Sequence, residues 1–399
     1  MRRPSAATVL AVASLAASLP AGPAAAAEPA SALDALDALE VRELPAPLPT
    51  DPAAPAWDAL PGLTVLAAPQ RTIRLHDQAA NAALARGGPR PVTVRAATDG
   101  QALAVLLEWA DATQDLARPD ATDGYGDGAA LQLPLHSGAG RRLPYVGMGD
   151  EREQVAVFLL RAGSAGTSTR AALGAGFGSL ARADLGPLAG GLRYDAAARR
   201  WRALFVRPLS AGGLDLRRGL LPFAVAVWDG AGQERGGNKA LSGWRFLRQP
   251  RLPLDEAYAA EQAWGRGQGD AARGRTLFEG TCTVCHATAV QREAAPGLAP
   301  DLSAIGLIST PGYLRDSLRD PSDVIVPSPN PRQHQDRAGK RDARGAWPVD
   351  EGYVWFALEA DGRRVSSMPD YASLPAPDVV DLVAYLMTLG AEPPAGRTP

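Results

Sequence analysis

The strongest chemical signal in this 399-residue chain is the segment Cys282-Thr283-Val284-Cys285-His286. It has the C-x-x-C-H arrangement of c-type haem attachment. Two thiols at this spacing can add to the two vinyl groups of one porphyrin, and the adjacent imidazole is then held against the ring as an axial ligand of the iron. A thioredoxin-like redox pair would need a βαβ context, and a zinc site would need further Cys or His nearby. We therefore expect one covalent haem c, attached through Cys282 and Cys285 and ligated by His286.

The iron of such a haem needs a second axial ligand. Met368 lies in "SSMPDY", on a predicted loop just before the last predicted helix. Met387 lies inside the helical pattern "VVDLVAYLMTL", where a thioether is expected to pack in the core. Met368 is therefore the predicted sixth ligand, and ligation by Met and His tends to raise the reduction potential of the iron.

A second chemical signal is one of the two lysines in an arginine-rich chain. Lys239 and Lys340 are the only lysines among 41 basic residues, which leaves 41 − 2 = 39 arginines. Lys239 lies in "QERGGNKALSGW", between two glycines and an apolar run. An amine can lose its proton and donate a lone pair to iron, whereas a guanidinium cannot. Neutrality at pH 7 costs a lysine roughly 4.6 kcal/mol, which a dry pocket and a bond to iron would offset. On spacing alone, a solvated loop lysine is the simpler interpretation.

The N-terminal segment has the pattern of an export signal. A short basic stretch precedes 14 apolar residues (6–19), and small residues then lead to a predicted cleavage site near Ala27. The apolar run is shorter than the roughly 20 residues that a membrane helix needs. We expect residues 1–27 to be a cleaved Sec-type signal, which makes the mature chain periplasmic and without a membrane span. An uncleaved anchor is the alternative, and Arg2-Arg3 only superficially suggests twin-arginine export.

Residues 28–252 are predicted to contain no long helix. Residues 28–62 are rich in Ala, Pro and Asp and are interpreted as a tether or loosely packed lead-in. Residues 63–252 contain short β-type runs broken by Gly, Pro and Asp, with hairpin-like turns at "TDGQ" and "YDAAARRW". The runs that carry this pattern are "TVLAAP", "RTIRLH", "PVTVRAATDGQALAVLLEWAD", "EQVAVFLLRA", "RWRALFVRPL" and "LLPFAVAVWDG". Many strands without intervening helices indicate an antiparallel β-sandwich.

From residue 253 to residue 392 the pattern becomes helical. The segments with 3.6-residue periodicity are "LDEAYAAEQAWGRG", "DAARGRTLFEGTCTVCH", "TPGYLRDSLRD" and "APDVVDLVAYLMTLG". A polar insertion (327–345) interrupts this region, and "YVWFALEADGRRVSSMP" after it has the pattern of a small hairpin. Residues 393–399 are a tail. The expected fold is thus multidomain: an antiparallel β-sandwich followed by an all-α cytochrome c domain.

Residues 265–392 resemble a monohaem class I cytochrome c. "GRTLFEGTCTVCH" resembles the first helix and haem site of that family, and "MPDYASLPAPDVVDLVAYLMTL" resembles its methionine loop and closing helix. "GLAPDL" resembles its proline loop, which implies that the carbonyl of Pro300 orients the axial His286. The insertion at 327–345 departs from the family pattern.

Residues 65–248 resemble the haem-b-binding γ subunit of the ethylbenzene and dimethylsulfide dehydrogenase type, in the type II dimethylsulfoxide-reductase family. The words that carry this resemblance are "LEWADATQD", "YGDGAALQLP", "PYVGMGDEREQVAVFLLRA", "RWRALFVRPL" and "FAVAVWDGAGQERGGNKALSGW". The resemblance implies one non-covalent haem b, held by Met148 of "GMGD" and Lys239 of "GGNKALSGW". It also implies two partners, a molybdopterin catalytic subunit and an iron–sulfur subunit, with a soluble electron carrier as the acceptor or donor. His136 and, less well, His76 are the competing ligands, and His334 is expected to be solvated.

The sequence shows no nucleophile–base constellation, phosphate loop or dinucleotide fingerprint. The net charge of −2 and the lack of a basic block argue against nucleic acid as a partner. The leading hypothesis is an exported dihaem electron-transfer protein that is not itself an enzyme, since the redox chemistry belongs to the cofactors. The alternatives are a carbohydrate- or ligand-binding sandwich fused to a monohaem cytochrome c, and a free-standing electron shuttle.

Overall fold

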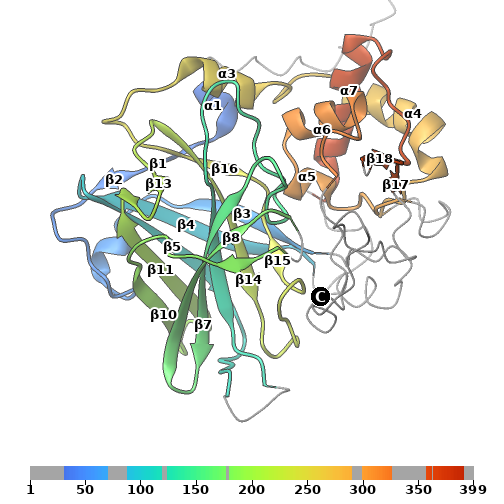
Figure 1. Ribbon diagram of the computed structural model, residues 1–399. Coiled ribbons are helices and arrows are strands. Elements are labelled where there is room, and N and C mark those ends of the chain that lie inside the picture. Colours follow the sequence, from blue (N-terminus) through green and yellow to red (C-terminus); the bar gives the residue numbers. More distant parts are fainter. Residues whose placement is uncertain are drawn as a thin grey trace, which may run out of the picture.

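The structure is a computed structural model that describes residues 31–70, 88–118, 124–176, 179–289, 299–325, 356–361 and 363–390. A large β-structure forms the N-terminal part, and a group of helices lies beside it (Figure 1). The predicted fold class, an antiparallel β-sandwich followed by a helical domain, is confirmed. The predicted signal (1–27), the strand run "RTIRLH", the insertion (327–345) and the tail (393–399) lie outside the described residues.

The strands of the sandwich follow one antiparallel path that folds into two facing layers. The first layer has the order β10-β11-β5-β4-β3 and the second the order β15-β14-β6-β7-β8-β9, with β3 and β15 joining them. Their bounds are β3 (Leu63–Pro69), β4 (Arg90–Thr98), β5 (Ala102–Ala110), β6 (Gly128–Pro134), β7 (Val155–Gly163), β8 (Gly166–Gly174), β9 (Ala181–Arg182), β10 (Ala189–Asp195), β11 (Arg200–Pro208), β14 (Leu220–Trp228), β15 (Ala240–Leu241) and β16 (Arg245–Arg248), the last of which pairs with β14. A separate small pair is β12 (Ser210–Ala211) with β13 (Leu214–Asp215).

Alternation along the strands gives each layer two apolar faces. On β14, Phe223, Val225 and Val227 point into the core between the layers. Their neighbours Ala224 and Ala226 belong to a different cluster on the outer face of the second layer. Successive side chains of a strand point to opposite faces, and because both faces here are apolar, each layer must be covered on the outside as well.

The segment expected to be a loose lead-in is instead part of the sandwich, so this prediction is wrong for residues 31–62. Its elements are α1 (Ala32–Leu36), β1 (Leu39–Glu40), β2 (Arg42–Glu43) and the 3₁₀ turn η1 (Pro55–Trp57). β1 pairs with β16 and β2 pairs with β4, both in parallel. Trp57 is fully buried with Leu48 and Leu60 on the outer face of the first layer. A few widely spaced apolar residues are enough to cover a sheet face, and they produce no periodic pattern in the sequence.

The helical region contains α3 (Glu256–Ala263), α4 (Ala271–Thr281), the 3₁₀ turn η2 (Cys282–Val284), α5 (Ile305–Ile308), α6 (Pro311–Arg319) and α7 (Ala376–Thr388). The predicted hairpin is present as β17 (Phe356–Leu358) and β18 (Arg364–Ser366). Helices α4, α6 and α7 share one apolar core. Within the described parts of the chain, no helix has the length and apolar character needed to cross a bilayer.

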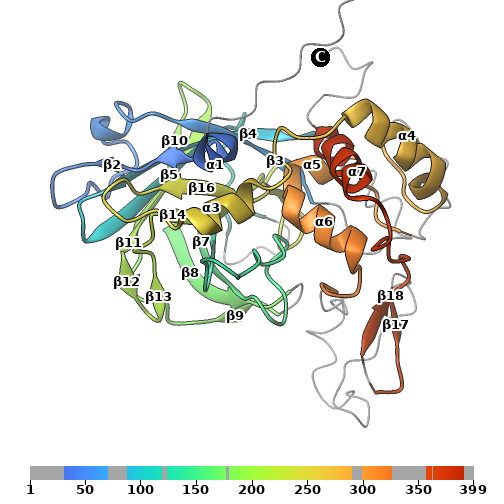
Figure 2. The ribbon, with the colours of Figure 1, turned by 90° about the horizontal axis from the view of Figure 1, so that it is seen from above.

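Helix α3 packs against α1 and the sandwich, and Tyr258 and Ala259 do not belong to the core that α4, α6 and α7 share. Tyr258 and Ala259 form a cluster with Leu36, Leu220 and Phe246 of the sandwich. The sequence therefore changes from strands to helices near residue 253, but the first helix after that point, α3, still packs on the sandwich. The core of the second domain begins near α4. Figure 2 shows α3 beside α1 on the sandwich, away from α4 and α7.

The crossing of α4 and α7 depends on a glycine. A Cβ on Gly274 would lie 1.9 Å from the carbonyl oxygen of Asp381 on α7. The same crossing is held by the ion pair of Arg273 with Asp381, whose carboxylate also accepts the N–H of Asp270 at 2.7 Å.

We predict that Gly274→Ala forces α4 and α7 apart and lowers the stability of the second domain by about 3 kcal/mol, the upper range for overpacking. Thermal unfolding followed by circular dichroism measures this. Gly280→Ala in the same helix is the control, because no heavy atom lies within 4 Å of the added Cβ. That control should be neutral or stabilising by up to about 1 kcal/mol, and equal stability of the two variants would contradict the prediction.

Candidate functional site

The two cysteines lie where the first helix of the second domain ends. Cys282 follows α4 directly and begins η2, and the backbone turns so that the N–H groups of Cys285 and His286 both donate to the carbonyl of Cys282. The thiols are not joined in a disulfide. Burial raises the pKa of Cys282 to about 11. The segment therefore offers two free thiols and an imidazole on one tight turn.

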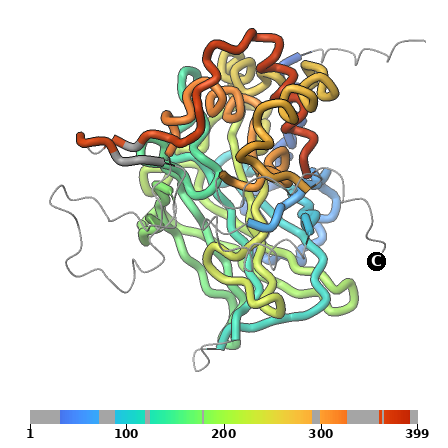
Figure 3. The backbone as a smooth tube through the Cα atoms, turned by 90° about the vertical axis from the view of Figure 1, so that its right-hand side faces the viewer, coloured from blue at the N-terminus to red at the C-terminus, as the bar shows by residue number. Residues whose placement is uncertain are grey.

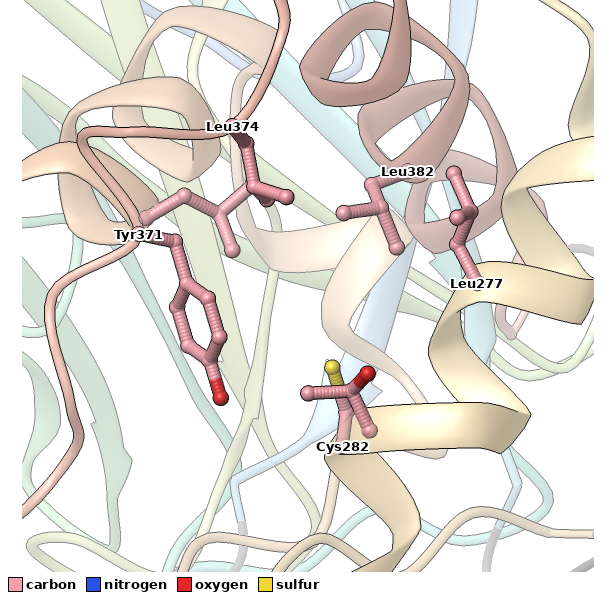
Figure 4. A pocket seen from close by; sticks show the side chains of 7 residues that line it. Leu277, Cys282, Tyr371, Leu374 and Leu382 are labelled. Carbon is pink, nitrogen blue, oxygen red and sulfur yellow. The ribbon is translucent and has the colours of Figure 1, made fainter.

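Beside this turn is a small hollow that is partly open to solvent. Its lining is almost entirely apolar and consists of Leu277, Thr281, Cys282, Leu318, Tyr371, Leu374 and Leu382. Figure 4 shows the labelled side chains around it: Leu277 of α4, Cys282 of η2, Leu382 of α7, and Tyr371 and Leu374 from the segment before α7. An apolar cleft next to two thiols fits a flat, largely apolar macrocycle attached through its vinyl groups.

His286 lies on the Cys282 turn, and Met368 packs on the core of the same domain. The Nδ1 of His286 lies 2.9 Å from the carbonyl oxygen of Pro300, so an Nδ1–H donor leaves Nε2 as the free ligand atom. Burial lowers the pKa of His286, which favours the neutral ring that a metal requires. Met368 packs against the core of the second domain together with Cys282 and Tyr371. Met387 packs on the same core from within α7.

Lys239 is buried, not solvated. It directly precedes β15 and its residue is only 5% exposed. The Nζ donates to Oε1 of Gln70 at 2.6 Å and lies 5.8 Å from the centre of the Trp228 ring. Within the described residues, no carboxylate forms an ion pair with it. Burial lowers the pKa of Lys239 from its ordinary 10.5 to about 8. This amine can therefore lose its proton near neutral pH and donate to a metal.

Met148 lies on a loop of tightly constrained geometry, residues 143–150, which we name the Met148 loop. Met148 has a left-handed φ of 76°, and its carbonyl accepts the N–H of Gly176 at 2.7 Å. The next residue, Gly149, also has a positive φ, and a Cβ there would lie 2.9 Å from two backbone oxygens. Glycine is thus required at position 149. Met148 is held in a backbone conformation that residues other than glycine rarely adopt.

Asp150 organises this loop from its last position. Its carboxylate is buried and accepts N–H groups from Tyr145, Arg152 and Glu153. It also receives a bidentate pair from Arg142, at 2.8 and 2.6 Å. Burial opposes the charge, but the hydrogen bonds and positive charge of Arg142 outweigh it and lower the pKa of Asp150. Asp150 therefore remains ionised and fixes the loop.

The Met148 loop and Lys239 both contact the same apolar surface. The outer face of the second layer carries a cluster that we name the outer cluster: Ala130, Val146, Val155, Ala224, Ala226, Trp228, Leu241 and Trp244. Val146 lies two residues before Met148, and the Lys239 amine lies over the Trp228 ring. Two further bonds tie the Met148 loop to this face, from Gln132 Nε2 to the carbonyl of Val146 and from Trp244 Nε1 to that of Pro144.

This surface fits a second, non-covalent haem in its chemistry. The face carries small side chains at three positions, Ala130, Ala224 and Ala226. The Lys239 amine, which can be neutral, lies over Trp228 of this face, and the Met148 loop contributes Val146 to it. The competing ligand His136 is exposed, whereas His76 and His334 lie outside the described residues. Arg161 lies on the same Trp228 ring, 5.5 Å from its centre, and adds a positive charge near the amine.

An acidic cluster was not anticipated from the sequence. The carboxylates of Asp111, Asp127 and Asp229 come within 4.8 Å of one another. Asp127 is fully buried and accepts N–H groups from Asp115, Gly230 and Trp201. Burial raises the pKa of Asp127 to about 6. Asp111 and Asp229 directly follow β5 and β14, and Asp127 directly precedes β6. Only the fold brings these three residues together.

Two family models match the chain. Residues 54–187 match the family described as ethylbenzene dehydrogenase, and residues 271–390 match cytochrome c. The first match covers most of the sandwich, including the Met148 loop, and ends before Lys239. The second covers α4 to α7 and all the predicted residues of the haem c site.

Three curated relatives align with parts of the chain. A protein of Haloferax mediterranei named as a respiratory nitrate reductase heme subunit is 27% identical over 49% of this chain and 67% of its own length. The chlorate reductase subunit gamma of Ideonella dechloratans is 34% identical over 37% of this chain and 59% of its own. The dimethylsulfide dehydrogenase subunit gamma of Rhodovulum sulfidophilum is 28% identical over 39% and 60%. The chain thus spans about three fifths of the two gamma subunits.

A solved structure described as a carbohydrate-binding protein of Bacteroides uniformis aligns with 56% of this chain and 95% of its own, at 13% identity and a TM-score of 0.31. A score this low establishes no common fold.

The two family matches fall on the two structural parts described above. The chain therefore joins a domain of the ethylbenzene dehydrogenase family to a cytochrome c domain.

Proposed function

We propose that this chain is an exported dihaem electron-transfer protein, the cytochrome subunit of a periplasmic molybdopterin oxidoreductase complex. The names of its relatives support the class: a heme subunit of a nitrate reductase and gamma subunits of a chlorate reductase and a dimethylsulfide dehydrogenase. Electrons would pass between an iron–sulfur partner subunit and a soluble carrier. When bound, each haem supplies a one-electron couple at its iron.

The observation that carries this proposal is the buried Lys239 amine on the same apolar face as the Met148 loop. A buried ammonium with no carboxylate partner is costly, and such a group is a candidate for function. A sandwich that only bound carbohydrate would have no need for it.

In the proposed assignment, four side chains hold iron and two hold a porphyrin covalently. His286 and Met368 would ligate the haem c iron, with Cys282 and Cys285 as the thioether links and Pro300 as the acceptor that orients the imidazole. Met148 and Lys239 would ligate the haem b iron. The chain's own contribution is to keep Lys239 dry and to hold Met148 in place through Asp150.

We predict that pyridine haemochrome spectra of the purified protein show equal amounts of haem b and haem c. Lys239→Ala and Met148→Ala should each lose haem b and keep the covalent haem. Met387→Leu is the matched control, because this methionine packs within α7, and it should retain both haems. A native spectrum of haem c alone, or an unchanged b-type spectrum in Lys239→Ala, would contradict the assignment.

A pH dependence follows from the lysine. The pKa of Lys239 is lowered by burial from 10.5 to about 8. Above pH 10.5 the lysine is neutral in both the folded and the unfolded chain, so its burial carries no charge penalty. The folded state loses stability as the pH falls from 10.5 to 8, because the unfolded chain takes up the proton first. Below pH 8, burial of the ammonium costs roughly 3 kcal/mol.

We predict that Lys239→Met, measured without haem b, is more stable than the native chain by up to about 3 kcal/mol at pH 7. This advantage should shrink between pH 8 and pH 10.5. Urea unfolding over a pH series gives the difference, in which all other titrating groups cancel. A difference that does not vary with pH would show that Lys239 is not buried as an amine.

The partner assignment is tested in the native host. We predict that the tagged chain co-purifies with molybdenum and iron–sulfur clusters in a fixed ratio to haem. A lone monomer that contains haem but no molybdenum would contradict membership of a complex and support a free-standing shuttle.

A further inference from the structure

The cytochrome domain is docked directly on the outer cluster of the sandwich. The N–H of Gly243 donates to the carbonyl of Leu307 on α5 at 2.8 Å, and Ile308 packs against the outer cluster. A Cβ at position 243 would lie 2.7 Å from the Leu307 oxygen, so only glycine permits this approach. Figures 2 and 3 show the second domain resting on one side of the sandwich. The second domain thus covers part of the face that we assign to haem b.

The docking continues onto the Met148 loop through an aromatic pair. The ring of Tyr145, in this loop, lies 5.9 Å from that of Tyr313 on α6, tilted by 42°. This separation is within the favourable range for aromatic pairs, which contribute about 0.5–1.5 kcal/mol beyond their buried area. A side chain of the second domain therefore packs three residues from Met148.

A charged network also connects the second domain to the two arginines that flank the Met148 loop, Arg142 and Arg152. Arg152 donates to the Asp323 carboxylate at 2.5 Å and also to the Asp323 carbonyl. The Nε of Arg142 lies 3.7 Å from that carboxylate, while the rest of its guanidinium holds Asp150. Asp323 follows α6, and its side chain is 30% exposed. Partly shielded, networked pairs contribute more than isolated surface pairs, so Asp323 restrains both arginines.

We propose that Tyr313 and Asp323 are positioning residues that hold the Met148 loop from the cytochrome domain. The left-handed conformation of Met148 costs of order 1–3 kcal/mol and persists only where its surroundings impose it. Asp150 and the bond from Gly176 impose it from within the sandwich, and Tyr313 and Asp323 add restraint from outside. The consequence for haem b rests on the proposed function, in which Met148 is an iron ligand. The haem b site is then built from both domains.

The test uses the full-length, haem-loaded protein with Asp323→Asn and Tyr313→Leu. Hydrogen exchange of residues 143–150 should become about tenfold faster in each variant, the change that corresponds to a coupling of about 1.4 kcal/mol. Transfer of haem b to an apo-globin acceptor should accelerate by a similar factor, while the haem c spectrum stays unchanged. Tyr313→Phe keeps the ring and should behave as the native chain.

Asp215→Asn is the matched control for charge, because Asp215 also pairs with an arginine, Arg217, at 2.9 Å, but on β13. It should leave exchange of the Met148 loop and haem b transfer unaltered. Native exchange in both Asp323→Asn and Tyr313→Leu would overturn the positioning role. Faster exchange with unaltered haem b transfer would support the positioning role and contradict Met148 as a ligand, so the two ideas fail separately.

Discussion

The proposed haem b site depends on the burial of one amine, Lys239, for which the described residues supply no compensating carboxylate. Lys239 is held by an amide oxygen and an aromatic ring, both of which tolerate a neutral amine as well as an ammonium. An arginine at this position would keep its charge at any physiological pH. Burial of Lys239 destabilises its ammonium form, and the same burial makes the neutral amine, with its free lone pair, accessible near neutral pH.

The outer cluster explains why the two domains form one body. An ordinary sandwich buries one face of each layer and solvates the other. Here the second layer is apolar on both faces, and its outer face is shared among the Met148 loop, Trp244 and Ile308 of the second domain. The first layer solves the same problem with Trp57 and its neighbours. Both coverings come from segments whose sequences carry little periodic signal.

Local spacing made the haem c site predictable, since Cys282, Cys285 and His286 are adjacent in the chain. The bond from His286 to Pro300 could be expected only through the family resemblance, and the structure contains it. Strands β8 and β10 were hard to recognise, because β8 begins with five exposed residues and β10 contains two glycines. The periodicity of α3 showed an apolar face but not its partner. Asp323 and Arg152 are 171 residues apart, and nothing in the sequence links them.

The contact between Gly243 and Leu307 joins main-chain atoms only. Exchange of a side chain elsewhere leaves its donor and acceptor in place, and position 243 itself admits nothing larger than hydrogen. The spacing of the two proposed haem sites would thereby depend on a backbone contact, separate from the side chains proposed to ligate each iron. Substitutions near either proposed haem could then change the driving force for electron transfer between them without changing the tunnelling distance.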